Sequence, residues 1–91
     1  MKATRIKMRA GCGTSNNLLE IDKIYLVDCK EPGYYSKASI YDYLKKYPNT
    51  IQVSIHPYPN LQPMLSSNNE KYVRSEPNEN GHDNLLCLPR S

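Results

Sequence analysis

The strongest constraint in this sequence is a single helical repeat, which lies between Ser36 and Tyr47 and has alternating segments on both sides. Apolar and aromatic side chains recur there three and four residues apart, as on one face of an α-helix, at Ile40, Tyr43, Leu44 and Tyr47. A serine, a favoured N-cap residue, starts the segment, two lysines occupy its last turn, and a proline follows. We therefore predict one helix, with these side chains packed on a β-sheet.

The first alternating segment, residues 4–10, is predicted to form a strand with one apolar face and one basic face. Arg5, Lys7 and Arg9 share the basic face, because neighbouring side chains of a strand point to opposite sides. No acidic residue precedes Glu20, so a local basic patch is expected here. Such a face is more often a solvated edge that discourages aggregation than a binding surface.

A second extended segment, residues 18–27, changes phase at Asp22 and Lys23, and a bulge or tight turn there would explain the change. Its last four residues are apolar on both faces, which is typical of a central strand. Further strand-like segments follow the helix at residues 51–55, 63–65 and 71–75.

Together these segments predict one domain, residues 1–91, with an α+β fold. We expect a small antiparallel or mixed β-sheet of about five strands, in the order β-β-α-β-β-β, with one helix packed on one face. Only 38% of the residues are hydrophobic, so the chain has material for a single core. The protein is expected to be a monomer or a homodimer.

The aromatic residues are eight tyrosines, without phenylalanine or tryptophan. A buried tyrosine needs a partner for its hydroxyl, whereas a tyrosine at the core margin can leave that group in water. Several of the tyrosines must therefore lie at the margin of the core or on the surface. Tyrosine is also a favoured contact residue for protein partners and for nucleic-acid bases.

The possible metal ligands do not form a recognisable site. Cys12, Cys29, His56, His82 and Cys87 lack the short paired spacings of structural zinc sites, so we expect no metal and no cofactor. Three cysteines without a close pair do not suggest a disulfide framework. No signal-like or membrane-spanning apolar run is present in the sequence. These features predict a cytoplasmic protein with reduced thiols and no membrane partner.

Catalytic constellations are also weak. Cys87 or Cys12 could be combined with His82 and Asp83, but adjacent side chains of an extended segment point to opposite faces. The glycine-containing segment 11–15 could form an anion-binding turn, yet it lacks the lysine and the following helix of a P-loop. We therefore expect a protein that is not an enzyme.

The C-terminal third resembles a known family. The segment KYVRS at residues 71–75, a polar loop and DNLLCLP at residues 83–89 are similar to the ending of a family of short bacterial proteins, domain of unknown function 3892. The chain length and the Ser-Lys pair at the start of the helix are also similar. The chain departs from the family at Pro77 and Asn78, where an Ala-Asp pair is usual. The resemblance implies a bacterial protein but no particular activity, substrate or cofactor.

Arg74, Asp83 and Asn84 within that ending allow two interpretations. In the structural one, Asp83 and Asn84 cap backbone N–H groups in a turn, and Arg74 pairs with Asp83 or with carbonyl groups of the turn. In the functional one, the three side chains line a pocket for a polar ligand. The structural interpretation is the favoured one.

The sequence therefore favours a small non-catalytic interaction module that binds a protein partner through its sheet surface. One alternative is binding of RNA, single-stranded DNA or a small phosphorylated ligand through the basic strand with Arg5, Lys7 and Arg9. A less favoured alternative is an uncharacterised enzyme.

Overall fold

A computed structural model describes residues 1–76 and 83–90 of the 91-residue chain. Its elements are six strands, one α-helix and two short 3₁₀ helices. The strands are β1 (Lys2–Met8), β2 (Ile21–Val27), β3 (Gly33–Ser36), β4 (Gln52–Val53), β5 (Leu61–Leu65) and β6 (Lys71–Ser75). The helices are α1 (Lys37–Lys46), η1 (Leu18–Glu20) and η2 (Asn84–Cys87).

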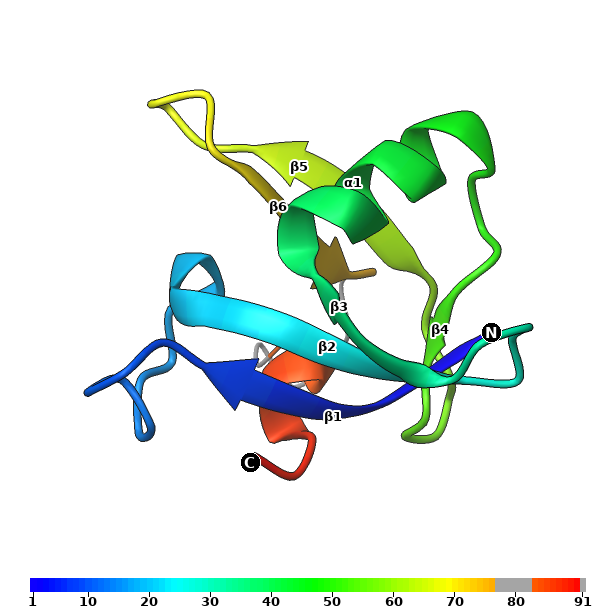
Figure 1. The fold of residues 1–91 in the computed structure, drawn as a ribbon, viewed down its shortest axis with the longest axis horizontal. Helices are drawn as coiled ribbons and strands as arrows, with labels where there is room; N and C mark the ends of the chain where they lie inside the picture. Colours follow the sequence, from blue (N-terminus) through cyan, green and yellow to red (C-terminus); the bar gives the residue numbers. More distant parts are fainter. Residues whose placement is uncertain (77–82, 91) are drawn as a thin grey trace.

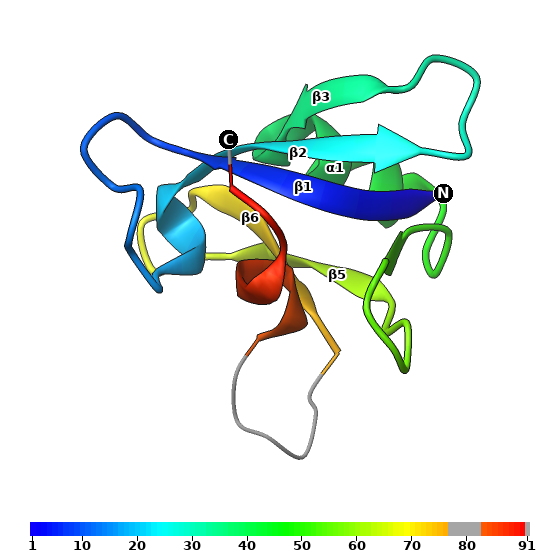
Figure 2. The same ribbon diagram turned by 90° about the horizontal axis from the view of Figure 1, so that it is seen from below.

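The strands divide between two sheets. The larger sheet has four strands in the order β3-β2-β1-β4, and it is mixed because β4 runs parallel to β1 while the other pairs are antiparallel. The smaller sheet is the antiparallel pair of β5 and β6. Figures 1 and 2 show α1 and the smaller sheet together on one side of the larger sheet. The predicted α+β class is confirmed, although one sheet was expected and two are present.

The core lies between these two layers. Its fully buried members come from every layer: Ile6 and Ile24 from the larger sheet, Leu44 from α1 and Val73 from the smaller sheet. Leu85 of η2 closes the same cluster from the C-terminal side. Burying aliphatic side chains of this size contributes about 1.5–3 kcal/mol each, so this one cluster holds the layers together.

The pairing of β1 with β2 contains two irregularities in register. Lys7 lies opposite Lys23 while Met8 lies opposite Ile21, so Asp22 is the extra residue of a bulge. Of the two alternatives that the change of phase left open, a bulge and a tight turn, the structure has the bulge. A second irregularity lies between Ala3 and Arg5 and brings Ala3, not Thr4, into the core.

The helix begins as predicted but turns a different face to the core. The side chain of Ser36 accepts a hydrogen bond from the backbone N–H of Ser39, which confirms the N-cap. Tyr41 is buried, whereas Tyr43 and Tyr47 are 38% and 47% exposed, so the prediction that both pack on a sheet is wrong. The helix α1 packs mainly on β5 and β6 and less on β2. Its buried face therefore includes Tyr41. No helix within residues 1–76 and 83–90 has the length and apolar character needed to cross a bilayer.

Other segments differ in extent from the predicted strands. Residues 18–20 form a 3₁₀ turn rather than the start of a strand, and the strand expected at residues 51–55 pairs only at β4. The strand β3 was not predicted, because its short sequence reads as a turn leading into a helix cap. The segment is extended because it pairs with β2, a contact that its own sequence does not indicate. The expected turn at Asn80-Gly81 and the residue His82 lie outside the described residues.

Candidate functional site

The face of the larger sheet that points away from α1 carries a row of three neighbouring side chains. Arg5 of β1 lies opposite Tyr25 of β2, and Tyr25 lies opposite Tyr34 of β3. Directly paired residues in antiparallel strands share one face of a sheet. The alternate residues of β1 and β2, Ile6 and Ile24, are fully buried on the other face. The row therefore belongs to the outer face of the sheet.

The next cross-strand row of this outer face is basic. Lys7 of β1 lies opposite Lys23 of β2, and both side chains are exposed. Within the described part of the chain, neither lysine nor Arg5 forms an ion pair. Like charges directly opposite each other destabilise a strand pair, so this row is a place where an anion would relieve repulsion.

The two tyrosines of the first row contact each other edge to face. Their ring centroids are 5.0 Å apart and their planes make an angle of 81°. Tyr25 is half-buried, and Tyr34 is 38% exposed. Such a pair holds its rings in a fixed orientation on the sheet surface. We use the name basic-aromatic face for Arg5, Lys7, Lys23, Tyr25 and Tyr34.

The third predicted cation, Arg9, is not part of this face, because its charge is already paired. Its Nη2 lies 2.9 Å from Oε2 of Glu70, and Nζ of Lys37 lies 2.6 Å from the same oxygen. The hydrogen bond from Lys37 and the charges of Lys37 and Arg9 hold the pKa of Glu70 below its ordinary value. Lys37, which is buried, also donates to the carbonyl of Leu19. Arg9 thus helps to join the end of β1 to α1 and the start of β6.

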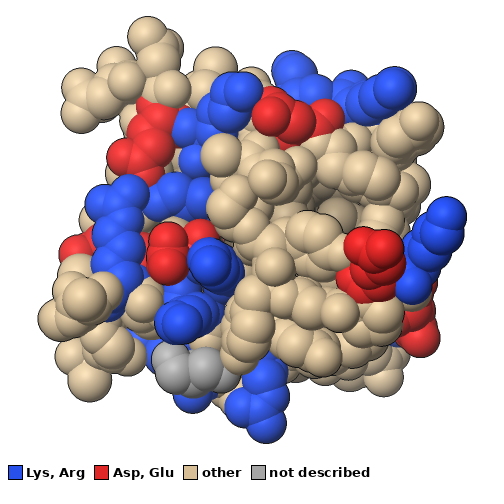
Figure 3. Space-filling view, in the orientation of Figure 1, with Lys and Arg blue, Asp and Glu red and all other residues tan. Residues whose placement is uncertain are grey.

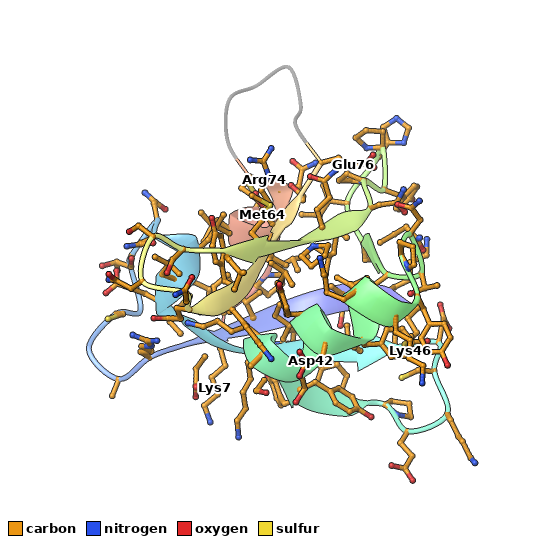
Figure 4. The ribbon with its side chains drawn as sticks, turned by 90° about the horizontal axis from the view of Figure 1, so that it is seen from above. Lys7, Asp42, Lys46, Met64, Arg74 and Glu76 are labelled. Atoms are coloured by element: carbon orange, nitrogen blue, oxygen red, sulfur yellow. The ribbon has the colours of Figure 1, made fainter. Side chains whose placement is uncertain are left out.

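The charged side chains are unevenly distributed over the surface. In Figure 3, lysine and arginine gather at the left, over the end of β1 and the start of β2, beside a broad uncharged area. Figure 4 shows Lys7 on the opposite side of the molecule from Met64, Arg74 and Glu76. The six residues predicted to bind a ligand therefore lie on two separate surfaces, and they do not form one site.

On the second surface, Asp83 and Asn84 have structural contacts. Oδ1 of Asp83 accepts hydrogen bonds from the backbone N–H of Leu85, at 2.9 Å, and from the hydroxyl of Ser75, at 3.0 Å. The backbone N–H of Asn84 donates to the Ser75 hydroxyl at 3.1 Å. This arrangement agrees with the capping that the structural interpretation predicts for Asp83. Arg74 lies opposite Gln62 and, within the described residues, forms no ion pair with Asp83.

A cavity of about 820 Å³ lies near these residues, between the loop before η1 and the pair of β6 and η2. Tyr72, Asp83, Leu86 and Cys87 line one side of it, and residues 15–19 line the other. Arg74 and Asn84 do not line this cavity, so the predicted pocket with three converging polar groups is not formed there. Among the described lining residues Asp83 supplies the one carboxylate, and Ser75 donates hydrogen bonds to it.

Cys12 and Cys87 were the two candidate nucleophiles. The Cys12 thiol donates a hydrogen bond to Glu20 at 2.9 Å, and this bond, together with burial, raises the pKa of the thiol. A raised pKa disfavours the nucleophilic thiolate. Cys87 is exposed and lies 3.7 Å from the carbonyl of Asp83. The triad that would include His82 lies partly outside the described residues, so it stays untested.

Sequence reasoning identified Arg5 and Lys7 but missed Lys23, Tyr25 and Tyr34. Tyr25 was assigned to a strand covered on both sides, and Tyr34 was assigned to no element. The signal that could have found Lys23 was the bulge at position 22, because it determines which residues of β2 face outward. Locating Tyr34 required the pairing of β3, which its own sequence does not indicate.

Comparison of the sequence with protein-family models and curated proteins, and of the fold with solved structures, finds no match. The family resemblance of the C-terminal third stays a prediction. The functional argument therefore depends on the residues of this chain alone.

Proposed function

We propose that the protein is a non-catalytic module that binds single-stranded nucleic acid on its basic-aromatic face. The observation that carries this proposal is the alignment of Arg5, Tyr25 and Tyr34 in one cross-strand row beside the row of Lys7 and Lys23. Cations and aromatic rings are thus interleaved over three neighbouring strands. A single strand of nucleic acid presents the complementary elements, phosphates and stacking bases.

Electrostatics support this class of ligand. Three cations lie on the basic-aromatic face, and no ion pair within the described residues neutralises Arg5, Lys7 or Lys23. The formal net charge of the whole chain is only +3, so attraction would be local rather than spread over the molecule. A short segment of single strand, rather than a wrapped duplex, fits so small a basic area.

The tyrosines favour nucleic acid over an acidic protein partner as the ligand. Either partner would neutralise the cations, but nucleic acid also offers a flat base to an aromatic ring at each step. Stacking of a base on an aromatic side chain contributes about 1–3 kcal/mol. With two tyrosines held in the same row as Arg5, the arrangement favours bases over acidic side chains. A protein partner, which the sequence favoured, becomes an alternative outcome of the test.

The experiment is a fluorescence-anisotropy titration of labelled single-stranded RNA and single-stranded DNA. The wild type is compared with Lys7→Ser/Lys23→Ser and with Tyr25→Leu. We expect weaker binding by both variants, and the lysine variant should also lose part of the salt dependence. Parallel titrations with RNA and DNA decide which of the two binds more tightly.

A matched control removes two lysines at another place. Lys45 and Lys46 are exposed near the end of α1, and Lys46 is far from Lys7 in Figure 4. Lys45→Ser/Lys46→Ser lowers the net charge by the same amount, yet it should leave the affinity nearly unchanged. Equal losses in both double variants would mean that net charge alone attracts the strand. Binding of an acidic protein but of no oligonucleotide would replace this proposal with the protein-partner alternative.

The proposal includes a cytoplasmic location. Cys12, Cys29 and Cys87 are free thiols in the structure. Free cysteines are usual in proteins of reducing compartments, where single-stranded RNA is also abundant. Trapping the thiols with a maleimide in freshly lysed cells would test this location.

A further inference from the structure

A second exposed aromatic residue, Tyr58, lies on the loop between β4 and β5. Its side chain is 49% exposed, and its φ angle of 59° lies in the left-handed region. That region is uncommon for a residue other than glycine and asparagine, and it costs about 1 kcal/mol or more. The backbone conformation at Tyr58 therefore costs conformational free energy, although the ring is half exposed to water. A glycine or an asparagine would fit this backbone conformation better.

The ring of Tyr58 is held by two neighbours. The rings of His56 and Tyr58 are nearly perpendicular, with centroids 5.8 Å apart and an interplanar angle of 86°. Nζ of Lys2 lies 4.2 Å from the centroid of the Tyr58 ring, in the geometry of a cation–π contact. A cation and an aromatic ring are therefore adjacent here, as they are in the row of Arg5 and Tyr25.

This cluster continues the basic-aromatic face along β1. Lys2 lies opposite Val27, one residue from the inward-facing pair of Ala3 and Leu26, so Lys2 points to the outer face. A strand rises about 3.3 Å per residue, which places Lys2 roughly 10 Å from Arg5. Figure 1 shows the loop between β4 and β5 below the strands, beside the start of β1. One extended strand of nucleic acid could pass over both places.

We propose that Lys2, His56 and Tyr58 form an additional subsite for a nucleotide at the end of the basic-aromatic face. This inference rests on the proposed function, because it extends the same surface. In this subsite, Tyr58 stacks with a base and Lys2 contacts a phosphate. An oligonucleotide that is long enough to reach the subsite gains affinity over one that covers only the rows of Arg5 and Lys7.

The experiment compares two lengths of oligothymidylate, about four and about twelve nucleotides, a range that matches known single-strand sites. The test variant is Tyr58→Asn, since asparagine accepts the left-handed backbone and the loop should keep its shape. We expect the affinity for the longer strand to fall about 5- to 150-fold, which corresponds to the loss of one stacked base. The affinity for the shorter strand should not change.

The control variant is Tyr47→Asn, which removes another exposed tyrosine, at the end of α1. It should bind both strands like the wild type. If the wild type binds the longer strand and Tyr58→Asn binds it equally well, the subsite is refuted while the proposed function stands. If the wild type binds neither strand, both proposals fail.

A second measurement uses the wild-type protein alone, so it does not depend on the folding of a variant. Amide chemical shifts are followed by NMR while each oligonucleotide is added. Shifts at His56 and Tyr58 that occur only with the longer strand support the subsite. Shifts confined to β1, β2 and β3 with both strands overturn it.

Discussion

The carboxylate of Asp83 accepts two hydrogen bonds from Ser75, one from its hydroxyl at 3.0 Å and one from its backbone N–H at 3.1 Å. Ser75 is 2% exposed, so its polar groups need partners inside the protein. The same carboxylate caps η2 through the backbone N–H of Leu85. Asp83 therefore joins the end of β6 to the C-terminal segment, across the residues between them.

Removal of this carboxylate should destabilise the fold. Asp83→Ala leaves the buried N–H and hydroxyl of Ser75 without their acceptor, and an unsatisfied buried polar group costs about 1–3 kcal/mol. The measurement is the free energy of unfolding from urea denaturation. Arg74→Ala serves as the control and should change the stability by about 0.5 kcal/mol or less. The reverse order of effects would contradict the capping role of Asp83.

The contribution of Glu70 should depend on pH. The hydrogen bond from Lys37 and the nearby charges lower its pKa in the folded protein from the ordinary value of 4.5. A carboxyl group with a lowered pKa stabilises the folded state fully above pH 4.5, and this stabilisation is lost as the pH falls through the lowered value. Wild type should therefore exceed Glu70→Gln in stability at neutral pH, and the difference should shrink in acid.

The measurement for Glu70 is the difference in unfolding free energy between wild type and Glu70→Gln over a range of pH. Glu31→Gln is a matched control, because the Glu31 side chain forms no ion pair within the described residues. Its difference from wild type should stay small and nearly constant. A difference for Glu70→Gln that does not change with pH would contradict the role assigned to the ion pairs.

The buried face of α1 predicts unequal effects for Leu44 and Tyr47, two residues of the helical repeat that was expected to pack on a sheet. Leu44 is 1% exposed, so Leu44→Ala should cost about 2–5 kcal/mol. Tyr47 is 47% exposed, and Tyr47→Ala should cost about 0.5 kcal/mol or less. Thermal and urea denaturation of both variants would measure this. Similar losses of stability in the two variants would mean that Tyr47 faces the core, as the helical repeat in the sequence predicted.

The strength of nucleic-acid binding should fall with salt in proportion to the number of phosphates contacted. Three cations, Arg5, Lys7 and Lys23, predict a log-log slope of about −2 for a single strand that is too short to reach Lys2. Each substitution of one cation by serine should reduce the slope by about 0.7. Titrations at several salt concentrations measure it. A slope near zero with retained binding would show that phosphates do not contact these side chains.

The sequence predicted those features that depend only on neighbouring residues, such as the cap of a helix and the alternation of side chains along a strand. The N-cap Ser36 was predictable because its own side chain bonds to the first turn of the helix. The irregularity at Asp22 was predictable, as a bulge or a tight turn, because it changes which side chains along one strand are apolar. The outward direction of Arg5 and Lys7 follows from the same alternation.

Long-range pairing decided the rest. Tyr25 lies beside Arg5 because β1 pairs with β2, and Tyr34 joins their row because β3 pairs with β2. Arg9 is not part of the basic-aromatic face because it pairs with Glu70, which is 61 residues away in the sequence. The sequence alone thus determined the periodicity and two of the five residues of the candidate surface, Arg5 and Lys7. Tertiary structure determined which charges remain available and which rings join them, because both depend on contacts between segments far apart in the chain.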